Sequence, residues 1–253
     1  SEVYLGYQPQ YSIASGKIKS TEALLRWNHP THGPMRADRL IQVAEGTTLM
    51  SKLTLWVFHT ALRECFEYRQ AGLDAGVSIN FSADDLRDSE LIELVAQGLN
   101  LWRVPPENVT VELTETAIMD NRSDTLNILY KLKDMGLKLA MDDFGTGYSS
   151  MARMLNLPLD EVKIDIIFVK HMTTHHTHHQ VVDSMINLAH RLNLSVVAEG
   201  VEDIATYERL QVLGCDIIQG YLIGKAMPLA DLIAAIAHRP VHLVHETALT
   251  SQS

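Results

Sequence analysis

The sequence predicts an α/β fold, a modified TIM (β/α)8 barrel with an antiparallel first strand. Strand-like and helix-like segments alternate along most of the chain, as in parallel sheets with crossover helices. The length of 253 residues is typical of such a barrel as a single domain. Only a few turn residues around Gly16 separate the first two strand-like segments, so these two should form an antiparallel hairpin rather than a parallel crossover.

Eight segments have the apolar, β-branched and aromatic composition of strands. The first two form the hairpin, and each of the other six follows a helix-like segment. The predicted strand ranges are 3–11, 17–27, 77–81, 109–115, 137–142, 161–165, 194–199 and 216–223.

The helix-like segments between these strands end at recognisable stop signals. Gly72, Gly136 and Gly214 follow three of them, and the Leu157-Pro158 step follows another. The predicted helices are 38–45, 51–70, 86–99, 123–135, 151–155, 180–192, 204–213 and 230–237. Residues 1–240 are therefore expected to form one barrel domain, and residues 241–253 a C-terminal tail.

Composition limits the class of protein. The chain is 46% hydrophobic with a formal net charge of −10, which fits a soluble protein and argues against a binder of nucleic-acid polymers. We find no run of about 18 apolar residues and no basic-then-apolar start, so we expect neither a membrane span nor a signal peptide. Cys65 and Cys215 are too few for a disulfide framework, which favours a cytoplasmic location. The start at Ser1, without Met, suggests a fragment of a longer protein.

The most distinctive stretch is residues 138–150, where a strand-like run ends in Asp142 and Asp143 and a glycine-rich and hydroxyl-rich loop follows. Successive side chains on a strand point to opposite faces, so both carboxylates can reach one cavity only where the backbone turns. Adjacent carboxylates repel unless a cation lies between them, and hard divalent ions such as Mg²⁺ prefer oxygen ligands. The alternative interpretation is that both residues cap the next helix.

Polar side chains also stand at the carboxyl ends of the other predicted strands, where such barrels place their active sites. These residues are Glu22, Asn80, Glu112, Glu115, Asp142, Asp143, Lys163, Asp165, Glu199 and Gln219. Any one of them could be a hydrogen-bonded core residue, but seven strands with the same pattern indicate a shared site. Metal ions would remove the repulsion among the carboxylates, and oxygen ligands without His or Cys favour Mg²⁺ or Mn²⁺ over zinc.

Seven short motifs follow one another along the chain: Glu22-Ala23-Leu24-Leu25-Arg26-Trp27, Asn80, Glu112-Leu113-Thr114-Glu115, Asp142-Asp143-Phe144-Gly145-Thr146-Gly147, Lys163-Ile164-Asp165, Ala198-Glu199-Gly200-Val201-Glu202 and Gln219-Gly220-Tyr221. In order and spacing they resemble the EAL domain family of bacterial cyclic di-GMP phosphodiesterases. The match runs from about Tyr7 to Pro228. The resemblance implies two Mg²⁺ or Mn²⁺ ions and hydrolysis of one phosphodiester bond of cyclic di-GMP to linear pGpG.

The resemblance also implies roles for individual residues. One ion would be held by Glu22, Asn80, Glu112 and Asp142, and the second by Asp142, Asp143 and Glu199. The catalytic group would comprise Lys163, Glu199, Glu115 and Gln219, with Glu115 anchoring the loop of residues 143–150. The residues expected to bind substrate are Gln8, Arg26, Asp165 and Pro228.

The implied partners are cyclic di-GMP, a second copy of the chain in a homodimer, and a sensory or GGDEF-type domain upstream in the full-length protein. One alternative is a catalytically inactive cyclic di-GMP receptor, and a more distant one is a barrel that acts on another phosphodiester. Every metal-ligand position matches the family, which favours the enzyme. Ile166-Ile167 departs from the usual basic residue followed by Ser, and Arg39-Leu40-Ile41 from the common Phe-Ile, so some substrate or loop contacts differ.

A cluster of histidines stands outside these motifs. His171, His175, His176, His178 and His179 lie within nine residues and could bind zinc or nickel. Their spacing also suits a solvated loop that leads into the helix expected at Gln180, and the loop is the favoured interpretation.

Overall fold

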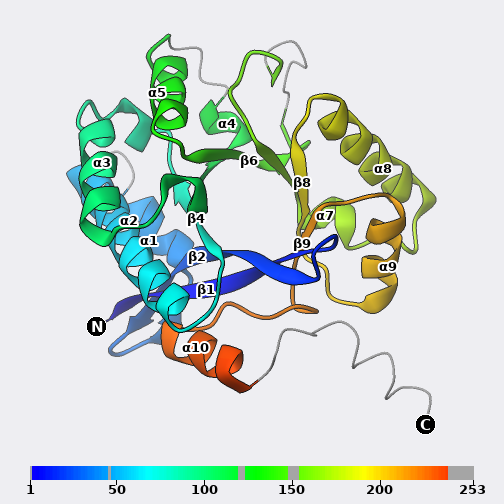
Figure 1. Cartoon of the computed structure of the whole chain (residues 1–253), viewed down its shortest axis with the longest axis horizontal. Helices are drawn as coiled ribbons and strands as arrows, with labels where there is room; N and C mark the ends of the chain where they lie inside the picture. The colour runs from blue at the N-terminus through cyan, green and yellow to red at the C-terminus, as the bar shows by residue number, and fades with distance from the viewer. Residues whose placement is uncertain (1, 45–46, 119–122, 148–153, 239–253) are drawn as a thin grey trace.

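The computed structural model describes residues 2–44, 47–118, 123–147 and 154–238. Nine strands in this part of the chain form one sheet in the order β1-β9-β8-β7-β6-β5-β4-β2-β3, and the additional pairing of β1 with β2 closes the sheet into a barrel (Figure 1). Helices surround the barrel on its outer side. The predicted fold, an α/β barrel with an antiparallel first strand, is confirmed.

The strands are β1 (Val3–Ser12), β2 (Lys17–His29), β3 (Gly33–Met35), β4 (Gly76–Phe81), β5 (Val109–Thr114), β6 (Lys138–Phe144), β7 (Glu161–Ile164), β8 (Ser195–Ala198) and β9 (Ile217–Gln219). From β2 through β4 to β9, neighbouring barrel strands run parallel. β1 pairs antiparallel with both of its neighbours, β2 and β9. Residues 13–16 can close a hairpin but cannot cross the barrel, and Gly16, with φ of 67°, allows the tight turn.

The register of β1 places polar residues of neighbouring strands beside each other. Gln8 lies opposite Glu22 in the pairing of β1 with β2. Gln10 lies opposite Gln219 in the pairing of β1 with β9. The reversed strand therefore contributes side chains to the interior from two successive positions on the same face.

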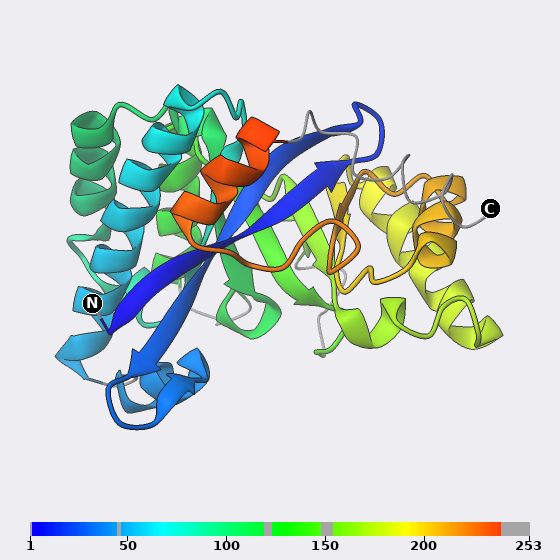
Figure 2. The ribbon, with the colours of Figure 1, turned by 90° about the horizontal axis from the view of Figure 1, so that it is seen from below.

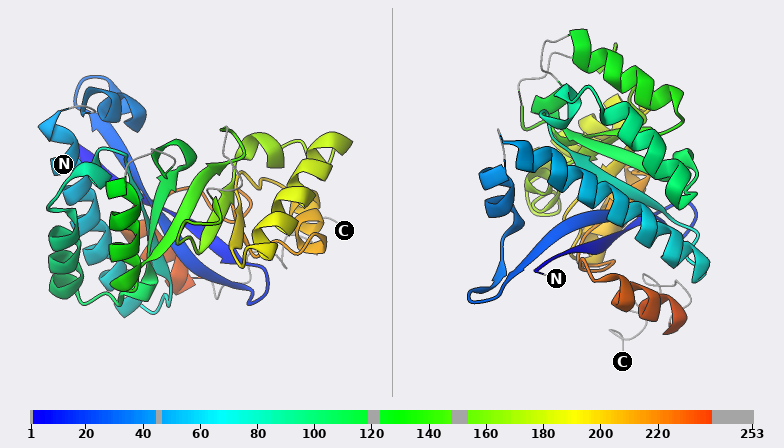
Figure 3. Two further views of the ribbon diagram at one scale, coloured as in Figure 1. Left: turned by 90° about the horizontal axis from the view of Figure 1, so that it is seen from above. Right: turned by 90° about the vertical axis from the view of Figure 1, so that its left-hand side faces the viewer.

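The helices are α1 (Ala37–Ala44), α2 (Thr48–Gln70), α3 (Leu91–Trp102), α4 (Glu115–Ile118), α5 (Ser123–Asp134), α7 (Ile166–Val169), α8 (His176–Arg191), α9 (Ile204–Val212) and α10 (Leu229–His238), with 3-10 turns η1 (Asp85–Arg87) and η2 (Pro106–Asn108). α10 lies against the long β1–β2 hairpin (Figure 2). The β2–β3 hairpin and α1 project beyond the rest of the barrel (Figure 3). None of the helices described is both long and apolar enough to cross a membrane.

Several predicted boundaries are wrong because short elements interrupt the longer patterns. β5 ends at Thr114, and Glu115, expected at the end of this strand, begins α4. Asp165, expected to end β7, instead caps α7, because its side chain accepts a hydrogen bond from Ile167 N at 2.7 Å.

Helices α3 and α8 show the largest differences between the expected and the observed first residue. α3 begins at Leu91 rather than at residue 86, because Asp85 opens η1 and accepts hydrogen bonds from Ser82 N at 2.7 Å and Ser82 Oγ at 2.6 Å. α8 begins at His176 rather than at Gln180, so three of the clustered histidines belong to a helix and not to a loop. Most of the predicted helix 151–155 and all of the predicted tail 241–253 lie outside the described residues.

Alternation along the strands separates the apolar core from the barrel interior. In β5, Val109, Val111 and Leu113 are fully buried on one face, and each contributes about 1.5–3 kcal/mol of stability through burial. Glu112 points to the other face. Gln10 of β1 hydrogen-bonds to Glu112 although β1 and β5 are not neighbours in the sheet, so both side chains lie in the interior. The interior of the barrel is therefore polar at the level of Gln10 and Glu112.

Candidate functional site

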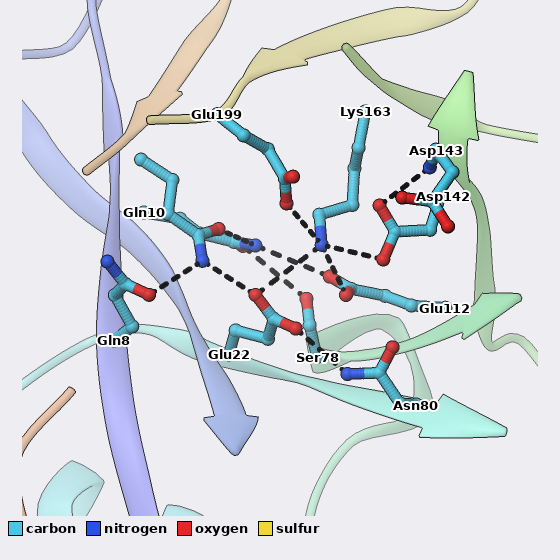
Figure 4. A network of polar contacts seen from close by, with 11 residues as sticks. Gln8, Gln10, Glu22, Ser78, Asn80, Glu112, Asp142, Asp143, Lys163 and Glu199 are labelled. Atoms are coloured by element: carbon cyan, nitrogen blue, oxygen red, sulfur yellow. Dashed lines mark hydrogen bonds and ion pairs between the residues drawn. The ribbon is translucent and has the colours of Figure 1, made fainter. Parts of the chain in front are cut away.

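The side chain of Lys163 lies at the centre of a group of carboxylates inside the barrel (Figure 4). It is fully buried on β7. Its Nζ lies 2.7 Å from Glu112 Oε2, 2.8 Å from Glu199 Oε1, 3.3 Å from Asp142 Oδ2 and 3.4 Å from Glu22 Oε2. Residues that are far apart in sequence thus surround one ammonium group. We use the name carboxylate centre for the six residues Glu22, Glu112, Asp142, Asp143, Lys163 and Glu199.

Amide side chains orient the carboxylates from the other side of the barrel. Gln219 Nε2 donates to Glu22 Oε2 at 2.6 Å, and Asn80 Nδ2 donates to Glu22 Oε1 at 2.8 Å. Gln10 Nε2 donates to Gln219 Oε1 at 2.9 Å and to Glu112 Oε1 at 3.3 Å. Because Asn80 donates through its nitrogen, its carbonyl oxygen is available as a ligand.

Gln10 and Ser78 belong to this network, and the sequence reasoning missed both. Ser78 Oγ donates to Gln10 Oε1 at 3.4 Å, and both residues are buried. Neither residue stands at the carboxyl end of a parallel strand, because Gln10 belongs to the antiparallel β1 and Ser78 lies inside β4, so an inspection of those ends overlooks them. A signal was available in β1, because Gln8 and Gln10 are two residues apart and must share a face of the strand.

Asp142 and Asp143 lie in an irregularity of β6, not at its end. The register between β6 and β7 shifts between Met141 and Phe144. Asp143 adopts a left-handed φ of 57°, which is uncommon for a residue other than glycine, and its N donates to Asp142 Oδ1 at 2.9 Å. This bulge directs Asp142 to Lys163. Residues 145–147 form a turn and a bend, and the start of the helix that the cap interpretation requires lies outside the described residues.

Burial and mutual repulsion set the charge states of the carboxylate centre. Burial opposes the charged form of Lys163, but the surrounding carboxylates, led by Glu112, raise its pKa well above the usual value, so it remains an ammonium. Burial, together with repulsion from neighbouring carboxylates, raises the pKa of Glu112 well above its usual value, that of Glu199 to about 7 and that of Asp143 to about 6. Burial also opposes ionisation of Glu22, but Lys163 and the amide donors lower its pKa below the usual value.

The donor set fits hard divalent cations. Carboxylate oxygens of Glu22, Glu112 and Asp142 all lie within 4.8 Å of one another. With Asp143 and Glu199, five carboxylates face one ammonium, a formal excess of four negative charges when all are ionised. Two divalent ions would neutralise this excess, and oxygen donors are the ligands that Mg²⁺ and Mn²⁺ prefer.

Glu115 connects the barrel to the loop that follows Asp143. Its side chain is buried, and its Oε2 accepts hydrogen bonds from Gly145 N at 3.1 Å and Gly147 N at 3.4 Å. A Cβ at Gly147 would lie 2.5 Å from Glu115 Oε1, so glycine is needed for this close approach. The position of Glu115 thus restrains the backbone beside the carboxylate centre.

Two of the predicted substrate-binding residues lie at the edge of the carboxylate centre. Gln8 accepts a hydrogen bond from Gln219 Nε2 and donates one to Gly224 O, both at 3.3 Å. Asp165 lies beside Asp143, and their proximity contributes to the raised pKa of Asp143, after burial and Asp142. Both residues therefore border the carboxylate centre.

The other two predicted substrate-binding residues lie farther out. Arg26 Nη1 donates to Leu25 O at 3.0 Å, and its stem packs against Gly6 of β1. Pro228 is exposed and precedes α10. In the described residues neither one hydrogen-bonds to the carboxylate centre. Ile166, which departs from the family pattern, packs so closely on Gly200 that a Cβ there would lie 2.1 Å from Ile166 Cγ1.

The family of the chain follows from comparison with known proteins. Residues 1–226 match the family model described as EAL domain. The chain belongs to the EAL domain family. It is 36% identical to the cyclic di-GMP phosphodiesterase NbdA of Pseudomonas aeruginosa over 232 residues, which cover 91% of this chain and 30% of NbdA. It is also 36% identical to the cyclic di-GMP phosphodiesterase RocR of the same organism over 222 residues, 88% of this chain and 57% of RocR.

Solved structures of EAL domains share the barrel. The PaMucR phosphodiesterase in complex with c-di-GMP superposes with a TM-score of 0.86 at 35% identity, covering 91% of this chain and 94% of that one. The EAL enzyme Bd1971, with cAMP and cyclic di-GMP bound, gives a TM-score of 0.89 at 28% identity over 93% of this chain and 65% of Bd1971. The chain spans about a third of the length of most curated relatives it matches, among them the bifunctional diguanylate cyclase and phosphodiesterase MucR of Pseudomonas aeruginosa.

Proposed function

We propose that this EAL domain hydrolyses one phosphodiester bond of cyclic di-GMP to linear pGpG with two Mg²⁺ or Mn²⁺ ions. The observation that supports this most strongly is the complete set of oxygen donors around Lys163, three of which already lie within 4.8 Å of one another. Relatives that are about 36% identical are cyclic di-GMP phosphodiesterases, and the related PaMucR domain binds c-di-GMP.

The ligands divide between two ion positions. Glu22, Asn80, Glu112 and Asp142 would hold one ion, and Asp142, Asp143 and Glu199 the other, with Asp142 belonging to both ligand sets. Bound ions of this kind activate water for attack on phosphorus and stabilise the attacking and leaving oxygens of an in-line displacement. The pKa values of Glu112 and Glu199, which are raised in the ion-free protein, make proton release part of metal binding.

Lys163 acts as a fixed cation rather than as a general base. Its pKa is raised by the surrounding carboxylates, so it keeps its proton at neutral pH and donates hydrogen bonds. It can therefore hold the attacking water in position and stabilise negative charge on the phosphate. Gln219 supports the same arrangement by orienting Glu22.

The remaining roles concern the loop and the substrate. Glu115 holds the loop after Asp143 and so positions Asp143. Gln8, Arg26, Asp165 and Pro228 would contact the nucleotide, with the guanidinium of Arg26 on a phosphate. The arrangement as a cytoplasmic homodimer with an upstream sensory or GGDEF-type domain stays a prediction, and MucR offers one example of such a longer relative.

The alternative function is a receptor that binds cyclic di-GMP without hydrolysing it. The deciding experiment incubates metal-stripped protein, refilled with Mg²⁺ or Mn²⁺, with cyclic di-GMP and separates the products by chromatography. We expect linear pGpG with either ion and none in a chelator. Nucleotide binding without product would support the receptor, and product formation in the chelator would contradict a metal-dependent reaction.

Glu22→Ala supplies the matched test of the site. The variant should lower turnover by about two or more orders of magnitude while the barrel still folds, because it removes a ligand and not core volume. Glu161→Ala is the control, since Glu161 is also a buried barrel glutamate but pairs with Lys19 and Ser195 outside the carboxylate centre. Equal loss in both variants, or unfolding of Glu22→Ala, would show that Glu22 is a structural residue.

A further inference from the structure

Three histidine rings gather at the turn between α7 and α8, away from the carboxylates. The ring centroids of His171 and His175 are 5.5 Å apart, those of His171 and His178 5.6 Å, and those of His175 and His178 5.7 Å. Three imidazoles on one tetrahedral ion, with metal–nitrogen distances of about 2.0–2.1 Å, have centroids roughly 5 Å apart. The three rings therefore already have nearly the separation that a shared ion requires.

The backbone keeps these rings on one face. His175 N donates to His171 O at 2.9 Å, and His179 N donates to His175 O at 3.1 Å. The first bond closes the turn after α7 and the second opens α8, with His175, the extended N-cap residue of α8, between them. The early start of α8 at His176 is therefore what brings the rings together, since a solvated loop would not hold them.

The ring nitrogens are suitable ligands. His178 Nδ1 is buried without a hydrogen-bond partner in the described residues, a state that costs about 1–3 kcal/mol. Thr174 Oγ1 lies 2.9 Å from His175 Nδ1, which leaves the Nε2 of that ring for a ligand bond and fixes its orientation. His171 and His175 are exposed, so an ion can reach them from solvent.

A small rotation of the rings would complete the site. The ring of His171 meets the rings of His175 and His178 edge to face. Among the described residues, ligand atoms that all lie within 4.8 Å of one another are found for Glu22, Glu112 and Asp142, so the nitrogen atoms of the three histidines still have to move closer together. The χ2 torsion of histidine is broad and soft, so the exposed ring of His171 turns at little energetic cost, whereas Thr174 holds the ring of His175 and that of His178 is half-buried.

We propose that His171, His175 and His178 bind one divalent transition-metal ion of the zinc class, with a fourth position open to water. Neutral imidazole nitrogen selects Zn²⁺, Co²⁺ or Ni²⁺, whereas Mg²⁺ prefers the oxygen donors of the barrel. The two sites therefore differ in ion as well as in place. An ion here would tie the turn after α7 to the first turn of α8, and α7 directly follows the strand that carries Lys163.

The experiment titrates the metal-stripped chain with Zn²⁺ by calorimetry, in an excess of Mg²⁺ that competes at the carboxylates. The test variant replaces His171, His175 and His178 by Gln. A matched control replaces three other histidines, His29, His32 and His176. We expect the test variant to bind one Zn²⁺ fewer per chain than the unmodified protein, and the control to bind the same number.

Two further measurements keep the result interpretable. Circular dichroism checks that the triple variant is folded, and the single variant His175→Gln, at an exposed N-cap position whose side chain makes no cap bond, provides a milder change. It should weaken that site at least tenfold, because one of three ligands is lost. Equal Zn²⁺ binding by the unmodified and test proteins, or an equal loss in the control, would overturn the proposal.

Discussion

Replacing Lys163 by Met removes the ammonium that four carboxylates contact while keeping most of the side-chain volume. In the protein without metal, Glu22, Glu112, Asp142 and Glu199 would then face one another without a cation. Removing one partner of a buried ion pair costs about 3–5 kcal/mol, because the other charge stays buried and uncompensated. For a domain of this size, 1 kcal/mol lowers the melting temperature by about 2–4 °C, so we expect a decrease of roughly 6–20 °C in a chelator.

The loss should depend on pH and on metal ions. Glu112 and Glu199 already have raised pKa values, and the folded variant raises them further, so it binds more protons than the unfolded chain between about pH 5 and 8. The stability of the variant should therefore fall as pH rises through this range. Saturating Mg²⁺ supplies the missing positive charge and should raise the melting temperature of the variant more than that of the unmodified protein.

The assay is thermal unfolding followed by circular dichroism, in a chelator and in Mg²⁺, at pH 6 and pH 8. Lys19→Met is the control, because Lys19 is exposed and its pair with Glu161 at 3.7 Å should contribute little. An unchanged melting temperature of Lys163→Met in the chelator, or equal effects of Mg²⁺ on both proteins, would refute the reasoning that Lys163 and the ions compensate the same carboxylates.

Four further predictions follow from the same contacts. Glu115→Ala should lower activity about 10–100-fold and reduce hydrogen-exchange protection of the loop after residue 143; unchanged activity and protection would exclude its anchoring role. Gln10→Leu should lower turnover to a similar extent in a folded protein, because Glu112 loses a donor; full activity would contradict this. Ca²⁺ should allow cyclic di-GMP to bind without hydrolysis, since it takes longer bonds of about 2.3–2.6 Å; turnover equal to that in Mg²⁺ would count against the two-ion site. Burial raises the pKa of Cys65 to about 11 and that of Cys215 to about 12, so neither should react with a thiol reagent at pH 8 until the chain unfolds, and rapid labelling of folded protein would show that they are exposed.

The barrel could be predicted because its long elements have clear patterns. Alternating strands, helices ended by glycine, and a hairpin too short for a crossover all point to one topology. The four-residue helices α4 and α7 could not be found in this way, because one turn has no apolar period. Their starts are set by local caps at the strand ends, where Asp165 accepts from Ile167 N and Thr114 accepts from Ala117 N, and an apolar pattern does not reveal these caps.

The carboxylate centre could be predicted because parallel strands end at the same rim of a barrel. What the pattern does not contain is the central position of Lys163 among four carboxylates, which depends on the closure of the sheet. Gln10 escaped notice because polar residues that alternate along a strand are also typical of a solvent-exposed face. The bulge at Asp143 depends on a left-handed backbone conformation that its residue type does not require.

The number of ions in the carboxylate centre can be measured by titrating the metal-stripped chain with Mn²⁺ and recording electron paramagnetic resonance spectra. Two ions about 3.5–4 Å apart, bridged by Asp142, should give two Mn²⁺ per chain and an exchange-coupled spectrum. Asp142→Asn should abolish the coupling. A single Mn²⁺ per chain, or two ions with uncoupled spectra, would contradict the two-metal centre.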